Sequence, residues 1–171
     1  MQSLPDYLGI GVDAIHDNVQ HIPTDPLAVG GYINGVVTRF IWTDADWAHF
    51  PVSYHIRINV TGERGRGNCL DVERGDATPA DVQPWLESVA SSPDPLLIYC
   101  NGSNLSACLA ARRAAGVHAW MWEATLDGTV PNRAMVQCFQ TKLPSGAAVT
   151  DVSLILDPRL RAAMVARIGR Q

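Results

Sequence analysis

The chain has 171 residues, 47% of them hydrophobic and 18% charged, a composition typical of one soluble globular domain with a sizeable core. It excludes a disordered or collagen-like chain, and no apolar run approaches the roughly 18 residues of a membrane span. The net charge is −4 and the basic residues are scattered, which argues against a nucleic-acid partner. Residues 1–10 contain no Lys or Arg, so we expect no secretory signal peptide there.

Eight short segments rich in β-branched and aromatic residues predict strands. Several are continuous apolar runs, a pattern typical of parallel strands covered on both faces. No repeat, linker or low-complexity tract interrupts them, so we expect residues 1–171 to form a single domain. In chain order the predicted strands are 8–13, 28–34, 54–60, 68–73, 96–100, 118–122, 134–139 and 151–156.

Capping residues predict four helices, over 43–50, 78–91, 101–116 and 157–167. The second has the clearest signals, because Thr78 supplies an N-cap hydroxyl and Pro79 follows at the first helical position. Its apolar residues recur at helical spacing, and we expect them to be buried. They are Val82, Trp85, Leu86 and Val89.

Four widely spaced cysteines, without a C-x-x-C pair, predict free thiols in the core. They are Cys69, Cys100, Cys108 and Cys138. We expect no metal site and no cofactor. A nucleophile and base formed by Cys100 and His118 is a minor alternative without a local signature.

Eight strands with helices concentrated in the first two thirds of the chain favour an α/β fold, a compact TIM-type β/α barrel with a reduced helical ring. Such barrels typically have about 250 residues, so several helices must be missing. The alternative is an open doubly wound sheet. Its dinucleotide signature is weak, because the G-x-G-x-x-A match at 9–14 overlaps the first predicted strand instead of following it. The glycine-rich run at 62–67 lacks the Lys-Ser/Thr ending of a P-loop and predicts a flexible turn.

Four acids stand at the ends of predicted strands. Asp13 ends the first strand, Asp71 and Glu73 end the fourth, and Asp151 begins the last. The carboxyl ends of barrel strands meet at one face, where catalytic residues are found. Asp71 and Glu73 lie two residues apart and should point to the same side, roughly 6–7 Å from each other, with Leu70 and Val72 toward the helices.

Acids that converge in one pocket repel each other, so we expect at least one raised pKa, as a general acid near neutral pH requires. Glycoside hydrolysis uses such a set, with one protonated carboxyl and one ionised carboxylate. The alternative is a capping role, since Asp at the end of a strand often caps the next helix or turn. We expect only capping from Asp44, Asp76 and Asp157.

The order of several short motifs along the chain resembles glycoside hydrolase family 25, the N-acetylmuramidase lysozymes, and especially divergent domains of this kind in high-GC bacteria and their phages. The resemblance spans about residues 8 to 156. The motifs are Gly11-Val12-Asp13, Leu70-Asp71-Val72-Glu73, Ile98-Tyr99, Met121-Trp122-Glu123-Ala124, Val136-Gln137 and Thr150-Asp151-Val152-Ser153.

The resemblance implies a barrel of five β/α units followed by three strands without helices, and cleavage of peptidoglycan between N-acetylmuramic acid and N-acetylglucosamine. It also implies site roles: Glu73 resembles the general acid, Asp71 its strand partner, and Asp13 and Asp151 the flanking acids. Tyr99, Trp122 and Gln137 would contact the glycan. The alternative for Trp122 is a place in the apolar core. The domain would then act outside the cell on the wall, or as part of a phage virion.

The sequence departs from the lysozymes at two places, at Ala14-Ile15-His16 and at Val136-Gln137-Cys138, where the family usually has Trp-Gln-Tyr. Part of the sugar-binding surface is therefore missing or relocated, and His16 is a candidate replacement contact. The alternative function is a non-catalytic glycan-binding or structural module of a phage virion tail or a cell envelope. An unrelated α/β enzyme is a third possibility.

Overall fold

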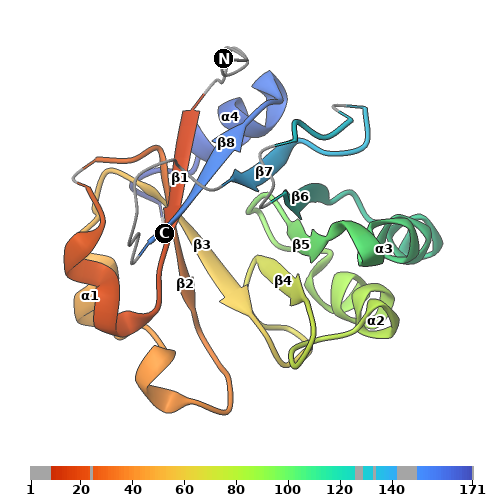
Figure 1. Ribbon diagram of the computed structural model, residues 1–171, viewed down its shortest axis with the longest axis horizontal. Coiled ribbons are helices and arrows are strands. Elements are labelled where there is room, and N and C mark those ends of the chain that lie inside the picture. Colours follow the sequence, from red (N-terminus) through yellow and green to blue (C-terminus); the bar gives the residue numbers. More distant parts are fainter. Residues whose placement is uncertain (1–8, 24, 126–128, 133, 142–149, 171) are drawn as a thin grey trace.

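The protein is a closed β-barrel with a partial ring of helices (Figure 1). A computed structural model describes residues 9–23, 25–125, 129–132, 134–141 and 150–170. Within these ranges eight strands follow one another around the barrel in sequence order. The elements are β1 Gly9–Asp13, η1 His16–His21, β2 Ala28–Tyr32, η2 Thr38–Phe40, α1 Asp44–Ala48, β3 Tyr54–Asn59, β4 Cys69–Val72, α2 Pro79–Val89, β5 Leu97–Asn101, α3 Gly102–Ala115, β6 Trp120–Ala124, β7 Cys138–Thr141, β8 Asp151–Ile155 and α4 Pro158–Val165.

Strands β1 to β7 pair in parallel, whereas β8 runs antiparallel to both β7 and β1 and closes the ring. In the β1–β8 register, Gly9 lies opposite Ile155 and Asp13 lies opposite Asp151. The reversed direction of β8 therefore brings its first residue to the barrel end where β1 finishes.

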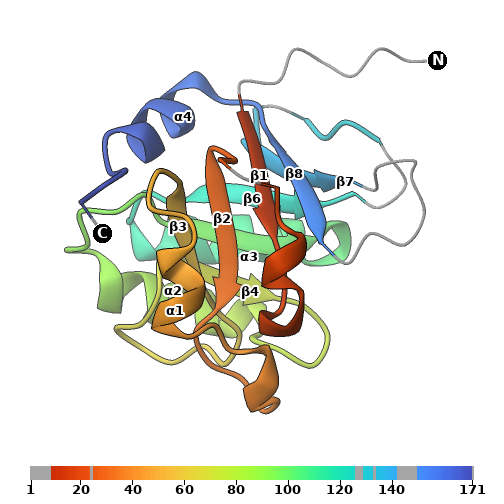
Figure 2. The ribbon, with the colours of Figure 1, turned by 90° about the vertical axis from the view of Figure 1, so that its left-hand side faces the viewer.

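Helices α2 and α3 pack side by side against the outside of β4 to β6 (Figures 1 and 2). The outward-facing residues of these strands, such as Leu70 and Val72, form one apolar cluster with the helices. The predicted buried face of α2 is confirmed, and Trp85 has no exposed surface. Thr78 and Asp81 form a capping box at its start, and α3 ends on Gly116 in the left-handed conformation (φ 63°).

The inward-facing residues fill the barrel, and α4 closes one end of it. Leu160 and Met164 of α4 are fully buried. They belong to one cluster with the first residues of five parallel strands, Ala28, Tyr54, Cys69, Leu97 and Trp120. Helix α4 therefore covers the amino end of the parallel strands, which leaves their carboxyl end for a site (Figure 2).

The predicted fold class is confirmed, with differences in detail. Five β/α units were expected, but β1 is followed by the 3-10 helix η1, and the fully described loop after β3 is a glycine-rich turn without a helix. Strand β7 begins at Cys138, four residues later than predicted. Leu8, the predicted first residue of the first strand, lies outside the described residues.

All four cysteines are buried free thiols. Cys100 faces the helix layer in the same cluster as Cys108, whereas His118 is exposed ahead of β6, so the structure does not support a Cys100–His118 pair. In the described part of the chain, no helix is both long and apolar enough to cross a bilayer.

Candidate active site

A cleft at the carboxyl end of the parallel strands contains the four predicted acids. Asp13 is the last residue of β1, Asp71 lies on β4 with Glu73 just beyond it, and Asp151 begins β8. The cleft has a volume of about 280 Å³. Its other lining residues are Tyr32, Ile58, Tyr99, Trp122 and Gln140.

Strand register explains why these side chains share one layer. Asp71 is paired with Tyr99, and Tyr99 with Trp122. Paired residues of neighbouring strands point to the same face of a sheet, here the barrel interior. Asp13 and Asp151 are direct partners across an antiparallel pair, where Cβ atoms lie about 4.5–5.5 Å apart.

Hydrogen bonds fix the aromatic side of the cleft. The rings of Tyr99 and Trp122 meet edge to face, with centroids 4.9 Å apart. The Tyr99 hydroxyl donates to Oε1 of Gln140, and the Trp122 indole Nε1 donates to Oγ of Ser153 at 2.9 Å. Both rings are therefore held in one orientation. Tyr99 is partly exposed, whereas Trp122 is 2% exposed and belongs to the apolar core, so of the two rings it is Tyr99 that offers a surface on which a sugar can stack.

Two of the acids are buried without full hydrogen bonding. Asp13 is 9% exposed and Asp71 is 4% exposed. Oδ1 of each carboxyl is buried and has no hydrogen-bond partner among the described residues. Leaving a buried polar atom unpaired costs about 1–3 kcal/mol. Such unpaired atoms are typical of a site that binds a hydrogen-bond donor.

Burial and neighbouring negative charges raise the pKa values of Asp13, Asp71 and Glu73. Burial is the main cause at Asp71, where it acts with the charges of Glu73 and Asp76 and raises the pKa to about 8. The pKa of Asp13 is raised well above its usual value, by burial and then by Asp151 and Asp71. The pKa of Glu73, which is partly buried, is also raised, by burial and then by Asp76 and Asp151. The cleft therefore favours protonated carboxyl groups.

The glycine at position 30 makes room for Asp13. Gly30 on β2 is paired with Asp13 on β1. A Cβ atom at Gly30 would lie 2.7 Å from Cβ of Asp13 and 3.2 Å from Cδ1 of Ile58. The close approach of β1 and β2 at the cleft thus depends on the missing side chain.

Gln137, a predicted substrate contact, does not line the cleft. Its Oε1 accepts a hydrogen bond from the Met121 backbone N–H at 3.1 Å. Gln137 directly precedes β7, and the alternation of that strand points its side chain away from the barrel interior. Gln140, three residues later, faces the cleft instead. His16 also lies elsewhere: its Nδ1 is hydrogen bonded to Oδ2 of Asp46 at 2.7 Å.

Of the two roles expected for Asp76, the cap of a helix or of a turn, the structure excludes the first, because Thr78 caps α2. Its backbone N–H donates to the Glu73 carbonyl in a tight turn, and its charge raises the pKa of both Asp71 and Glu73. Asp157 does cap α4, and Asp44 is the first residue of α1 after the cap Thr43.

Tyr32, Ile58 and Gly30 had no assigned role in the sequence analysis. Tyr32 ends β2 as Asp13 ends β1, so the same argument from strand ends could have found it. Nothing local marks Gly30, because its role depends on a neighbouring strand.

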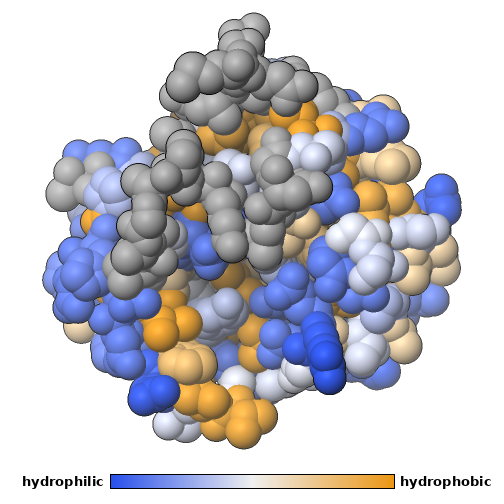
Figure 3. Space-filling model, in the orientation of Figure 1, coloured by the Kyte–Doolittle hydropathy of each residue, from blue (hydrophilic) through white to orange (hydrophobic). Residues whose placement is uncertain are grey.

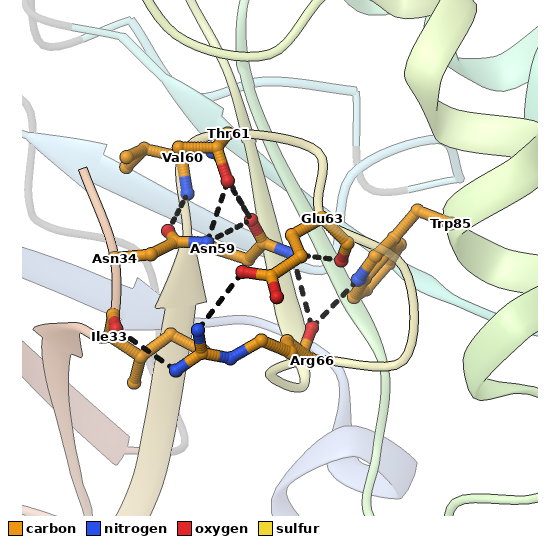
Figure 4. A network of polar contacts seen from close by, with 8 residues as sticks. All are labelled: Ile33, Asn34, Asn59, Val60, Thr61, Glu63, Arg66 and Trp85. Carbon is orange, nitrogen blue, oxygen red and sulfur yellow. Dashed lines mark hydrogen bonds and ion pairs between the residues drawn. The ribbon is translucent and has the colours of Figure 1, made fainter. Parts of the chain in front are cut away.

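A polar network supports the loop between β3 and β4, next to the cleft (Figure 4). Asn59 is fully buried, and its Nδ2 donates to the carbonyl groups of Glu63 (2.7 Å) and Arg66 (3.2 Å). The Trp85 indole also donates to the Arg66 carbonyl, at 2.9 Å. The loop is thereby tied to both β3 and α2. Among the described residues, no group of three His, Cys, Asp or Glu side chains is placed to hold a metal ion.

Comparison with known proteins finds a match in structure only. No protein-family model matches the chain, and no curated protein matches its sequence. The structure is similar to that of a family GH25 lysozyme from Aspergillus fumigatus, with a TM-score of 0.51 and 11% sequence identity. The match covers 91% of this chain and 98% of that chain. The chain thus has the fold of a GH25 lysozyme, which confirms at the level of fold the resemblance predicted from the motifs.

Proposed function

We propose that this protein is a glycoside hydrolase that cleaves the glycan strands of bacterial peptidoglycan between N-acetylmuramic acid and N-acetylglucosamine. One observation carries the proposal: Asp13, Asp71, Glu73 and Asp151 line a single cleft at the carboxyl end of a barrel with the fold of a GH25 lysozyme. Active sites of β/α barrels lie at this end.

Glu73 has the properties of the general acid. Its carboxyl is partly buried and its pKa is raised, so the protonated form persists to a pH closer to neutral. In the proposed reaction Glu73 gives this proton to the glycosidic oxygen as the bond to the sugar carbon breaks. A water molecule completes the hydrolysis: its oxygen is added to the sugar carbon, and the proton it loses passes to a carboxylate of the cleft. The adjacent charge of Asp76, which raises the pKa of Glu73, makes the protonated form more available.

Asp13, Asp71 and Asp151 stabilise the positive charge that develops on the sugar ring. Burial favours the neutral forms of Asp13 and Asp71, as their raised pKa values indicate. A cation in the cleft reverses this preference, since a nearby opposite charge favours the ionised carboxylate. Asp151 is exposed to water at the mouth of the cleft. Tyr99 supplies an aromatic surface for a sugar ring, and the buried Trp122 ring packs against it.

The test is the release of reducing ends from purified peptidoglycan by the unmodified protein and by Glu73→Gln. The amide keeps the size of the side chain but has no proton to give, so we expect turnover to fall by about 10²–10⁴-fold. Glu87→Gln is the matched control, because Glu87 is exposed on α2 and accepts a hydrogen bond from Gln83 in the same helix.

Two outcomes would contradict the proposal. If the unmodified protein binds peptidoglycan but releases no reducing ends between pH 4 and 8, the domain is a glycan-binding module. Equal turnover by Glu73→Gln would keep a hydrolase but assign its acid elsewhere. Assembly into a virion tail or a cell envelope stays a prediction from the sequence resemblance.

A further inference from the structure

The cleft that contains Asp13, Asp71, Glu73 and Asp151 is called the acid cleft. A second groove continues it outward over β1 to β4. It has a volume of about 330 Å³, and Tyr32 lines both cavities. Three segments give one residue to the cleft and a later one to the groove. The pairs are Asp13 and Ile15, Ile58 and Val60, and Glu73 and Asp76. A ligand in the acid cleft that carries a side branch would therefore direct the branch into this outer groove.

The outer groove is mainly apolar. Its walls include Ile15, Val37, Phe40 and Val60, and Val37 is 41% exposed. Figure 3 shows hydrophobic side chains at the lower edge of the molecule, over the segment that follows β2 in Figure 1. Clustered exposed apolar side chains beside a polar cleft are typical of a binding surface.

Hydrogen bonds hold the walls of the outer groove in place. The Asn34 side chain accepts from the Val60 N–H at 2.9 Å and donates to Oδ1 of Asn59 at 2.9 Å (Figure 4). On the opposite wall, the backbone N–H of Phe40 donates to the carbonyl of Val37 at 3.0 Å. A preformed groove loses little conformational entropy when it binds a ligand.

We infer that the outer groove binds the lactyl–peptide branch of the N-acetylmuramyl residue whose glycosidic bond lies in the acid cleft; this inference rests on the proposed function. The branch begins with a lactyl methyl group and continues through an alanyl methyl group, which suit Val37, Phe40 and Ile15. The amide N–H between them is a donor for the Asp76 carboxylate at the rim.

Charge adds selectivity for a branch that carries peptide. Asp76 lines the outer groove, and Glu73 lies three residues earlier at the edge of the cleft. Cations in the surroundings include Arg74, next to Gly75 in the chain, Arg66, which donates to the Ile33 carbonyl at 3.4 Å, and Arg39, whose guanidinium lies 5.3 Å from the Phe40 ring centre. None of these three lines the groove. Without peptide the lactyl group ends in a carboxylate, which the Asp76 carboxylate repels, whereas the amide is neutral.

The experiment compares the initial rate of reducing-end release from peptide-bearing glycan strands with that from strands denuded by an amidase. Burial of two methyl groups predicts a preference of about tenfold for the peptide-bearing strands. Val37→Asn should reduce this ratio about three- to tenfold. Asn is a favoured N-cap residue, and Val37 is the N-cap of η2, so the local fold should tolerate it. Val52→Asn is the matched control, because Val52 is exposed and does not line the groove.

A second measurement separates this inference from the proposed function. Binding of soluble N-acetylmuramyl-L-alanyl-D-isoglutamine, followed by calorimetry, should weaken in Val37→Asn and in Asp76→Asn but not in Val52→Asn. If neither kind of strand is cleaved, hydrolysis is wrong, and the binding measurement alone decides the inference. Equal rates on both strands, or equal binding by all variants, would overturn the inference and leave hydrolysis standing.

Discussion

The carboxyl of Asp71 couples the acid cleft to the stability of the whole chain. Its pKa is about 8 in the folded protein, because of burial first and then the charges of Glu73 and Asp76. In the unfolded chain the pKa returns to about 3.9. Between these values the folded chain binds more protons than the unfolded chain, so the free energy of unfolding decreases as the pH rises from about 4 to about 8.

We therefore predict that Asp71→Asn stabilises the protein at pH 8 and flattens this pH dependence. The amide is neutral at every pH, so the gain at pH 8 should be on the order of 1 kcal/mol or more. Urea unfolding at pH 5 and pH 8 measures it, with Asp44→Asn on the exposed first turn of α1 as the control. An equal pH dependence in the unmodified protein and Asp71→Asn would rule out Asp71 as its source.

Gly30 and Gly11 lie on neighbouring strands and make different contacts. A Cβ atom at Gly30 would meet Asp13 Cβ at 2.7 Å, whereas one at Gly11 would meet Ser153 Cβ at 3.8 Å, an ordinary contact. Gly30→Ala should destabilise the protein by about 1–3 kcal/mol and displace Asp13, with loss of turnover. Gly11→Ala should be tolerated. Thermal unfolding and reducing-end release of the two variants test this, and equal behaviour would contradict it.

At the scale of elements, the loop between β3 and β4 combines buried and exposed polar contacts. Asn59 is fully buried and bonds both the Asn34 side chain after β2 and the backbone of this loop, whereas the Arg66–Glu63 ion pair is exposed. Asn59→Ala removes the hydrogen bonds to the Glu63 carbonyl and to the Asn34 side chain and should cost about 1–3 kcal/mol. Arg66→Gln should cost less than about 1 kcal/mol. Urea unfolding compares them, and a larger loss in Arg66→Gln would contradict this ranking.

Elements with local signals were predictable from the sequence. Helix α2 starts at Pro79 because Thr78 and Asp81 cap it, and the spacing of Val82, Trp85 and Leu86 identifies its buried face. The acids were predictable because they stand at strand ends. Which side chains of β7 face the barrel interior was not predictable, since a shift of one residue turns every side chain of a strand to the other face. Gln140 therefore lies in the cleft where Gln137 was expected.

Contacts between segments far apart in the sequence could not be predicted from the sequence pattern. Gly30 matters because Asp13 lies across a strand pair from it, and no local motif marks that relation. The glycine-rich run at 62–67 correctly predicted a turn after β3, where the five β/α units implied by the resemblance would place a helix. Pairing partners in a barrel are fixed by the complete sheet rather than by any one segment.

At the scale of the molecule, stability and the site lie at opposite ends of the barrel. Leu160 of α4 is fully buried against the amino end, away from the acids. Leu160→Ala should cost about 2–5 kcal/mol, while turnover well below the unfolding temperature stays unchanged. Val165→Ala, on the exposed side of the same helix, should be close to neutral. Thermal unfolding and turnover at low temperature test both, and lost turnover in a folded Leu160→Ala would contradict the separation.

The pairing of β1 with β8 also has a consequence for protein synthesis. Asp13 leaves the ribosome early and Asp151 late, yet the two are direct partners across the closing seam of the barrel. Any nascent chain that ends before β8 lacks one wall of the acid cleft and cannot assemble the four carboxylates. Completion of translation through β8 is therefore a precondition for chemistry in the cleft, and truncated products of this chain should be inert toward glycan.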